Sequence, residues 1–382
     1  MKAYVLHDIN NFKLEEVANP VPAENEVLVA VKAAGICGSD IPRVYKTGTY
    51  SYPLIPGHEF SGVVEELGNG VDKQWLGKRV GIFPLIPCRK CVPCQKKQYE
   101  MCRSYSYLGS RRDGGFAEYV TVPVDNLVEL PENVSFEEAA MLEPMAVAVH
   151  AMRRVQPKAL DTVAVCGLGT IGLLVVMFLK EAGVENILVV GNKEFQRQTV
   201  LGLGVPEENY CDCKESEVEQ WITARTKGFG VDIFFECVGK NETVTQAINC
   251  VMPGGKIMLV GNPYSDMKLE KAVYWKILRH QLLVTGTWNS SFYFPGDEKE
   301  LANPDMWLDD WHYVMNLLKE KRIAPARLIT HTYSLEDLKK GFHIMRDKSE
   351  DYIKEMGVFL LENRRSFHEL DKNLQKSSNL QL

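Results

Sequence analysis

The chain has 382 residues, of which 45% are hydrophobic and 25% are charged, and its formal net charge at pH 7 is −6. This length exceeds the usual size of one hydrophobic core and predicts two domains, and the composition is that of a globular protein. The acidic balance argues against a nucleic acid or an anionic membrane surface as a partner.

The sequence indicates neither a secretory signal at its start nor a membrane-spanning segment. Residues 1–8 reach charged and polar side chains too early for a secretory signal. The longest apolar run, at residues 171–179, is far shorter than the ~20 residues of a membrane span. The ten cysteines then indicate metal ligands and free thiols in a reducing compartment. We therefore expect a cytoplasmic protein with no membrane partner.

The first part of the chain, up to about residue 147, is rich in Val, Gly and Pro. Short alternating runs at residues 26–32 and 62–67 predict strands of a compact antiparallel barrel with Gly/Pro turns. Potential metal ligands are dispersed along this part: Cys37 and Ser39 on a turn after a strand, the pair His58–Glu59 after a Pro/Gly turn, and Glu143 near its end. A thiolate, an imidazole and a carboxylate suit Zn²⁺, and a catalytic zinc keeps one position open. Spacing alone does not exclude a buried structural Cys or His.

Four cysteines are concentrated within residues 88–102: Cys88, Cys91, Cys94 and Cys102. Each Cys-x-x-Cys step lets two thiolates point at one centre, and four thiolates satisfy the tetrahedral preference of Zn²⁺. The alternatives are two disulfides or a redox pair, but short gaps in a chain without an export signal favour a metal. This pattern predicts a closed, structural zinc site.

From about residue 148 short apolar strands alternate with helical segments. Strands are predicted at residues 161–166, 187–190, 231–235 and 256–260, and a helix at residues 171–182. This alternation is typical of a doubly wound parallel sheet, so the fold class is α/β.

A glycine-rich loop joins the first of these strands to the helix, and consists of Gly167, Leu168, Gly169, Thr170, Ile171 and Gly172. In this position the glycines allow a tight turn, close approach to a pyrophosphate and helix–strand contact. The helix N-terminus presents unpaired N–H groups to the phosphates. We expect a dinucleotide site here rather than a chance glycine-rich turn.

The end of the second parallel strand bears on the identity of the dinucleotide. An acidic residue that binds the ribose hydroxyls of NAD usually stands there, but this chain has Gly191, followed by Asn192 and Lys193. Without that carboxylate a 2′-phosphate is not repelled, and Lys193 or Arg197 is able to pair with it. The alternative is that both residues belong to a solvated helix start. NAD or NADP is therefore expected, with NADP favoured.

Together these motifs resemble the zinc-dependent medium-chain dehydrogenases/reductases. The order of Cys37 and Ser39, Gly57–Glu59, the four cysteines, Glu143–Pro144 and the glycine loop carries this resemblance, which extends to about residue 362. Within the family the chain is most similar to the polyol dehydrogenase branch, with its sorbitol, threonine and galactitol-1-phosphate dehydrogenases. Residues 84–88, 109–119 and 276–279 favour the last of these.

The resemblance implies a GroES-like β-barrel catalytic domain at 1–147 and 289–362, with a zinc lobe at 84–104. It also implies a Rossmann dinucleotide-binding domain at 148–288, which leaves a polar tail at 363–382. One catalytic and one structural zinc are implied, the former held by Cys37, His58 and one or both of Glu59 and Glu143. Ser39 would relay a proton. The implied reaction is hydride transfer from a secondary alcohol to nicotinamide, in a homodimer or homotetramer.

Arginines near these motifs indicate a phosphorylated polyol, because guanidinium groups bind phosphate oxygens well. The candidates are Arg43, Arg111 and Arg112, and Trp288 and Asn289 line the pocket by analogy with the branch. The alternative for the arginines is surface or interdomain ion pairs. The competing functions are a dehydrogenase of an unphosphorylated substrate and, from another class, a zinc-binding nucleic-acid module that the acidic charge disfavours.

Overall fold

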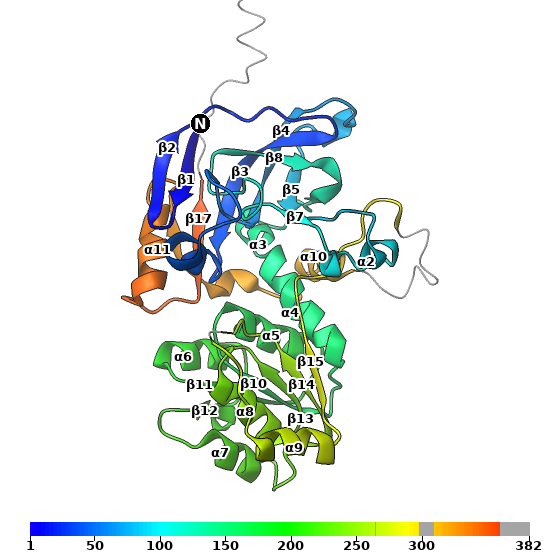
Figure 1. Cartoon of the computed structure of the whole chain (residues 1–382), viewed down its shortest axis with the longest axis vertical. Coiled ribbons are helices and arrows are strands. Elements are labelled where there is room, and N and C mark those ends of the chain that lie inside the picture. The colour runs from blue at the N-terminus through cyan, green and yellow to red at the C-terminus, as the bar shows by residue number, and fades with distance from the viewer. Residues whose placement is uncertain (264, 298–308, 360–382) are drawn as a thin grey trace, which may run out of the picture.

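The computed structural model describes residues 1–263, 265–297 and 309–359, and the expected polar tail at 363–382 lies outside these ranges. The fold is α/β, with a mixed sheet in one part and a parallel sheet in the other (Figure 1). None of the helices in the described ranges combines the length and the apolar character that crossing a bilayer requires. The domain boundaries expected near residues 147 and 289 stay predictions.

The mixed sheet has β3 (Glu26–Ile36) near its centre, and β3 is buried along most of its length. Its strands run in the order β16 (Ile329–Tyr333), β17 (Lys354–Val358), β3, β4 (Glu59–Leu67), β5 (Arg79–Ile82) and β9 (Leu127–Glu129), and β8 (Tyr119–Pro123) also pairs with β3. The antiparallel pairing expected for the first part of the chain is confirmed between β3, β4, β5, β8 and β9. The two C-terminal strands, β16 and β17, pair in parallel.

Two short hairpins complete this part of the molecule. β1 (Lys2–Asp8) pairs with β2 (Asn11–Glu16), and β6 (Leu85–Ile86) pairs with β7 (Ser106–Tyr107) around the four-cysteine segment. Helices α1 (Asp40–Pro42), α2 (Val92–Gln95), α3 (Phe136–Ala140), α10 (Asp310–Lys319) and α11 (Leu338–Asp347) belong to the same part.

The parallel sheet has six strands in the order β12 (Tyr210–Asp212), β11 (Asn186–Gly191), β10 (Thr162–Cys166), β13 (Val231–Glu236), β14 (Val251–Leu259) and β15 (Leu283–Gly286). All neighbouring pairs are parallel. The apolar runs that predicted these strands are buried on both faces, as parallel sheets covered by helices require. The helices that alternate with them are α5 (Thr170–Glu181), α6 (Glu194–Gly202), α7 (Val218–Arg225), α8 (Asn241–Cys250) and α9 (Lys271–Arg279).

Helix α4 (Leu142–Val155) passes between the two parts and packs against α5 and α10 (Figure 1). One buried apolar cluster continues through this helix, from Phe83 and Trp311 on one side to Val165 and Phe235 on the other. A continuous core of this kind fixes the two parts relative to each other. The carboxyl ends of the parallel strands are therefore held beside the mixed sheet.

Candidate metal and dinucleotide sites

Three of the dispersed ligands are brought together by the pairing of β3 with β4. Cys37 follows β3, His58 precedes β4, and Glu59 is the first residue of β4. Gly35 is paired with Glu59 across the two strands. One ligand atom from each of Cys37, His58 and Glu59 lies within 4.8 Å of the others. A β-carbon at position 35 would overlap the Glu59 carboxylate, so this approach requires glycine.

A buried carboxylate, Asp40, organises one side of this group. Its Oδ2 accepts a hydrogen bond of 3.0 Å from the backbone N–H of Cys37, its Oδ1 lies 3.6 Å from Nδ1 of His58, and Arg43 forms an ion pair with it. Burial lowers the pKa of His58, but Asp40 and Cys37 outweigh burial and raise that pKa well above its ordinary value. Asp40 therefore orients and polarises the imidazole.

The opposite side of the group is closed by Lys354 of β17, whose side chain is 2% exposed. Its Nζ donates hydrogen bonds to the Glu59 carboxylate and, at 3.1 Å, to the backbone oxygen of Ile36. Burial lowers the pKa of Lys354, but the Glu59 carboxylate outweighs it and the pKa is raised. Lys354 thus balances the charge of a carboxylate that water does not reach.

Glu143 lies in the first turn of α4, and its Oε1 accepts a hydrogen bond of 3.0 Å from the hydroxyl of Tyr107. The Tyr107 ring lies 5.8 Å from the His58 ring, measured between centroids. Burial raises the pKa of Glu143, an effect that His58 opposes and Glu59 reinforces. In the described ranges, the group within 4.8 Å contains Glu59 and not Glu143.

The donor set of the first site fits zinc, because it combines a thiol, an imidazole and a carboxylate, and Cys37 remains partly exposed. Nδ1 of His58 is buried and accepts or donates no hydrogen bond among the described residues, which suits an imidazole that serves as a metal ligand. Ser39 lies beside this group, and its Oγ donates to Sγ of Cys37 at 3.2 Å. That position is compatible with the expected proton relay.

The four cysteines of the second site converge. Sγ of Cys91 lies 3.5 Å from Sγ of Cys94 and 3.9 Å from Sγ of Cys102, and Sγ of Cys88 lies 3.9 Å from Sγ of Cys94. Four sulfurs placed tetrahedrally at ~2.3 Å from one zinc are about 3.8 Å apart, which matches these separations. They are far longer than a disulfide bond of ~2 Å, and all four cysteines are free. This geometry fits a closed zinc site.

The glycine loop joins β10 to α5, as expected from the sequence. Gly167 has φ +96°, and a β-carbon at Gly172 would overlap the carbonyl oxygen of Gly167. A β-carbon at Gly169 would meet no atom within 4 Å, so this glycine faces open space at the N-terminus of α5. Leu168 is buried, while Thr170 and Ile171 are partly buried. The loop thus has the geometry that dinucleotide binding requires.

A side chain at Gly191, where the acid would stand, would require neighbouring side chains to shift. A β-carbon at Gly191 would lie 2.9 Å from Cδ1 of Leu168 and 3.0 Å from the hydroxyl of Tyr210. Asn192 is exposed, and Nζ of Lys193 lies 3.4 Å from Oδ1 of Asp351. The guanidinium of Arg197 pairs instead with two carboxylates of its own domain, Glu194 and Glu207.

The expected phosphate-binding arginines have partners within the chain. Arg43 holds Asp40, and Arg112 donates to Glu26 at 2.6 Å, at the end of β3 opposite to Cys37. The Arg111 guanidinium lies over the rings of Tyr50 and Tyr105, at 4.4 and 4.1 Å from their centroids. Neither Arg43 nor Arg112 is therefore free to bind phosphate in this structure.

Trp288 and Asn289, the two residues expected to line the pocket, differ in their surroundings. Trp288 is 58% exposed, whereas Asn289, with φ +53°, donates through Nδ2 to the backbone oxygen of Glu100 at 3.2 Å. Asn289 thus ties this segment to the four-cysteine lobe.

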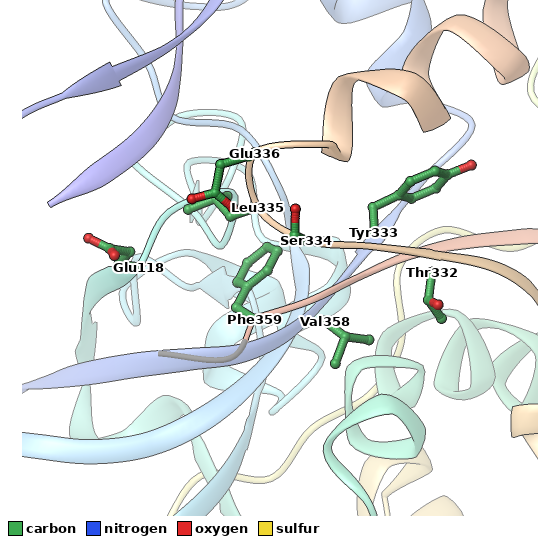
Figure 2. Close-up of a pocket in the computed structure, with 8 residues that line it drawn as sticks. All are labelled: Glu118, Thr332, Tyr333, Ser334, Leu335, Glu336, Val358 and Phe359. Carbon is green, nitrogen blue, oxygen red and sulfur yellow. The ribbon is translucent and has the colours of Figure 1, made fainter. Parts of the chain in front are cut away.

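A cavity of about 340 Å³ lies in the part of the molecule that contains the mixed sheet (Figure 2). Figure 2 shows Glu336, Leu335 and Phe359 gathered on one side of it, with Thr332 and Tyr333 on the other. None of the residues that line this cavity is one of the expected site residues. The cavity is accordingly separate from the two metal sites.

Sequence reasoning missed Asp40, Tyr107 and Lys354 as parts of the first site. Asp40 stands in the same run as Cys37, and that proximity was the available signal. Tyr107 and Lys354 follow no motif, because each reaches the site only through the pairing of its strand.

Two family models match the chain: "Alcohol dehydrogenase GroES-like domain" over residues 23–132 and "Zinc-binding dehydrogenase" over residues 170–303. Galactitol 1-phosphate 5-dehydrogenase of Escherichia coli K12 is 33% identical, over 84% of this chain and 89% of that protein. Sorbitol dehydrogenase of Halalkalibacterium halodurans is 31% identical, over 91% of this chain and 96% of that protein.

Solved structures with the same architecture agree with these matches. The crystal structure of galactitol-1-phosphate dehydrogenase from E. coli aligns with a TM-score of 0.84 at 30% identity, over 94% of this chain and all of that one. An E. coli alcohol dehydrogenase, RspB, complexed with NADH has a TM-score of 0.82 at 27% identity, over 94% and 99%. A zinc-binding dehydrogenase of Sinorhizobium meliloti bound to NADP also has a TM-score of 0.82, at 28% identity over 94% and 98%.

Proposed function

Because the chain belongs to the zinc-dependent medium-chain dehydrogenases/reductases, we propose that it oxidises a secondary alcohol of a polyol phosphate to a ketose phosphate. Galactitol 1-phosphate or a close relative is the proposed substrate, and NAD or NADP accepts the hydride. The observation that carries this proposal is the convergence of Cys37, His58 and Glu59 within 4.8 Å, in a chain that also has the glycine loop. The similarity to galactitol 1-phosphate 5-dehydrogenase supports the choice of substrate.

Two zinc ions are proposed, one at each cysteine-containing site. At the first site Cys37, His58 and Glu59 would hold the metal, which when bound supplies a Lewis acid that lowers the pKa of the substrate hydroxyl. Lys354 donates a hydrogen bond to the Glu59 carboxylate, and the Asp40 carboxylate lies beside the His58 ring. Glu143, with its hydrogen bond from Tyr107, is the second candidate carboxylate, and the zinc contents of Glu59→Gln and Glu143→Gln variants distinguish the two.

Proton transfer is assigned to Ser39. Its hydroxyl lies beside Cys37 at 3.2 Å and is only partly buried, so it connects the metal site with solvent. A hydroxyl both donates and accepts, which allows it to receive the proton of the substrate and pass it on.

The dinucleotide is proposed to lie across the glycine loop, with its pyrophosphate at the N-terminus of α5. The absence of an acid at Gly191 and the presence of Lys193 support NADP as an acceptor beside NAD. A homodimer or homotetramer is supported by apolar side chains exposed on α9 and on the edge strand β15, among them Trp275, Leu278 and Leu283. The ten free cysteines support a reducing, cytoplasmic location.

The second candidate function is a sorbitol- or threonine-type dehydrogenase that acts on an unphosphorylated substrate. The engagement of Arg43 and Arg112 with Asp40 and Glu26 favours it, because a phosphate would have to displace these carboxylates. Arg111 is the remaining candidate for binding a substrate phosphate, because its guanidinium lies over aromatic rings and a phosphate would not have to displace a carboxylate from it.

A substrate panel tests the choice. Initial rates are measured for galactitol 1-phosphate, galactitol, sorbitol and threonine, each with NAD and with NADP. We expect kcat/KM for the phosphorylated polyol to exceed that for the free polyol. An equal or higher kcat/KM for an unphosphorylated substrate would contradict the polyol-phosphate proposal and support the second candidate function.

A further inference from the structure

A loop of the part that contains the mixed sheet contacts the part that contains the parallel sheet. Residues 348–353, between α11 and β17, form this loop, called the bridging loop below; in Figure 1 it lies at the boundary between the two parts. The carbonyl oxygen of Ile353 accepts a hydrogen bond of 2.6 Å from Oγ1 of Thr170. Oδ1 of Asp351 lies 3.4 Å from Nζ of Lys193, and the same Nζ lies 5.9 Å from the centre of the Tyr352 ring.

Thr170 and Lys193, the two residues that the bridging loop contacts, both lie in the proposed dinucleotide site. Thr170 is the first residue of α5, next to the place of the pyrophosphate. Lys193 lies two residues beyond the end of β11, where the adenosine ribose is bound in folds of this type. The bridging loop therefore borders the adenosine side of the proposed dinucleotide site.

The charged side chains near the bridging loop differ in whether a bound phosphate could reach them. Arg197 is occupied by Glu194 and Glu207, and Glu350 of the bridging loop faces His331 at 3.6 Å. Lys193 has Asp351 as its carboxylate partner, and the two side chains are 36% and 57% exposed. A 2′-phosphate that approaches Lys193 is repelled by the negative charge of Asp351, whereas the 2′-hydroxyl of NAD is uncharged and is not repelled.

We propose that Asp351 is a specificity-determining residue, which supplies from the bridging loop the acid that β11 lacks at Gly191. By holding Lys193 and repelling a 2′-phosphate, it weakens the binding of NADP and leaves that of NAD unchanged. The proposal rests on the proposed dinucleotide site, and it deepens that proposal by assigning the balance between the two cofactors to one carboxylate.

Equilibrium binding of NADH and NADPH to the purified full-length protein tests this assignment, with nucleotide fluorescence as the signal. Asp351→Asn is expected to lower the Kd of NADPH by about 5-fold, the upper range for an exposed charge pair, and to leave the Kd of NADH within 2-fold. Lys193→Met is expected to raise the Kd of NADPH. In the Lys193→Met background only the direct repulsion of the phosphate remains, so Asp351→Asn should lower the Kd of NADPH by a smaller factor than it does in the presence of Lys193.

A matched control separates this local effect from net charge. Asp347→Asn removes the same charge from a carboxylate that pairs with Arg346 at the end of α11, and it should change neither Kd. Equal tightening of both nucleotides by Asp351→Asn, an unchanged NADPH Kd, or the same tightening by Asp347→Asn would overturn the assignment. Failure of the wild-type protein to bind either nucleotide would overturn the dinucleotide site itself.

Discussion

Lys354 donates a hydrogen bond to the carboxylate of Glu59 across a separation of 295 residues in the chain. Both side chains are 2% exposed, so the pair stands in a region that water does not enter. The contact joins the C-terminal strand β17 to the first residue of β4, next to Cys37 and His58. A metal site that combines a thiolate with a carboxylate gains a balancing charge from this lysine.

Replacement of Lys354 by methionine is expected to leave Glu59 buried without its partner. Breaking a buried pair in this way costs about 3–5 kcal/mol of unfolding free energy. Urea unfolding followed by circular dichroism measures the loss. Lys340→Met, which removes an exposed lysine paired with Asp337 on the surface, should stay within about 0.5 kcal/mol of wild type. Similar midpoints for the two variants would refute the role given to Lys354.

Two glycines of the dinucleotide loop should respond differently to alanine. In Gly172→Ala the added carbon meets the Gly167 carbonyl, so we expect a loss of about 1–3 kcal/mol in stability. In Gly169→Ala the added carbon lies more than 4 Å from every described residue outside its own chain neighbours, so stability is kept, while NADH binding weakens because the backbone no longer approaches the pyrophosphate. Thermal unfolding without nucleotide, together with the Kd of NADH, separates the two outcomes. Equal stability of both variants would contradict the packing described for this loop.

Many elements of the fold could be predicted because each is encoded by a short, continuous stretch of sequence. The strands β10, β11, β13 and β14 were expected from apolar runs, and the glycine loop from its place between a strand and a helix. The convergence of the four cysteines follows from spacing alone.

The partners of the arginines could not be predicted in this way. Arg112 meets Glu26 at a separation of 86 residues, and no pattern near Arg112 indicates that carboxylate. The same holds for Tyr107 and Glu143, and for the parallel pairing of β16 with β17 beside antiparallel strands. These features depend on tertiary packing, which periodicity does not encode.

Loss of one cysteine from the second site should remove one zinc and weaken the fold. In Cys91→Ser a thiolate is missing from a closed set of four, and a closed zinc site contributes folding free energy. We expect a zinc content lower by one per chain and a lower Tm. Cys213→Ser changes an exposed cysteine outside both metal groups and should retain the full zinc content. Full zinc content and an unchanged Tm in Cys91→Ser would be incompatible with a structural zinc.

The central claim is that a metal held by Cys37 and His58 activates an alcohol beside a nicotinamide ring. Zinc content and polyol-phosphate oxidation, measured together on the wild type and on Cys37→Ser, test it most directly. The account predicts two zinc ions per wild-type chain, and in Cys37→Ser one zinc, a native circular dichroism spectrum and no detectable hydride transfer. A Cys37→Ser variant that keeps both zinc ions and the wild-type rate would contradict it.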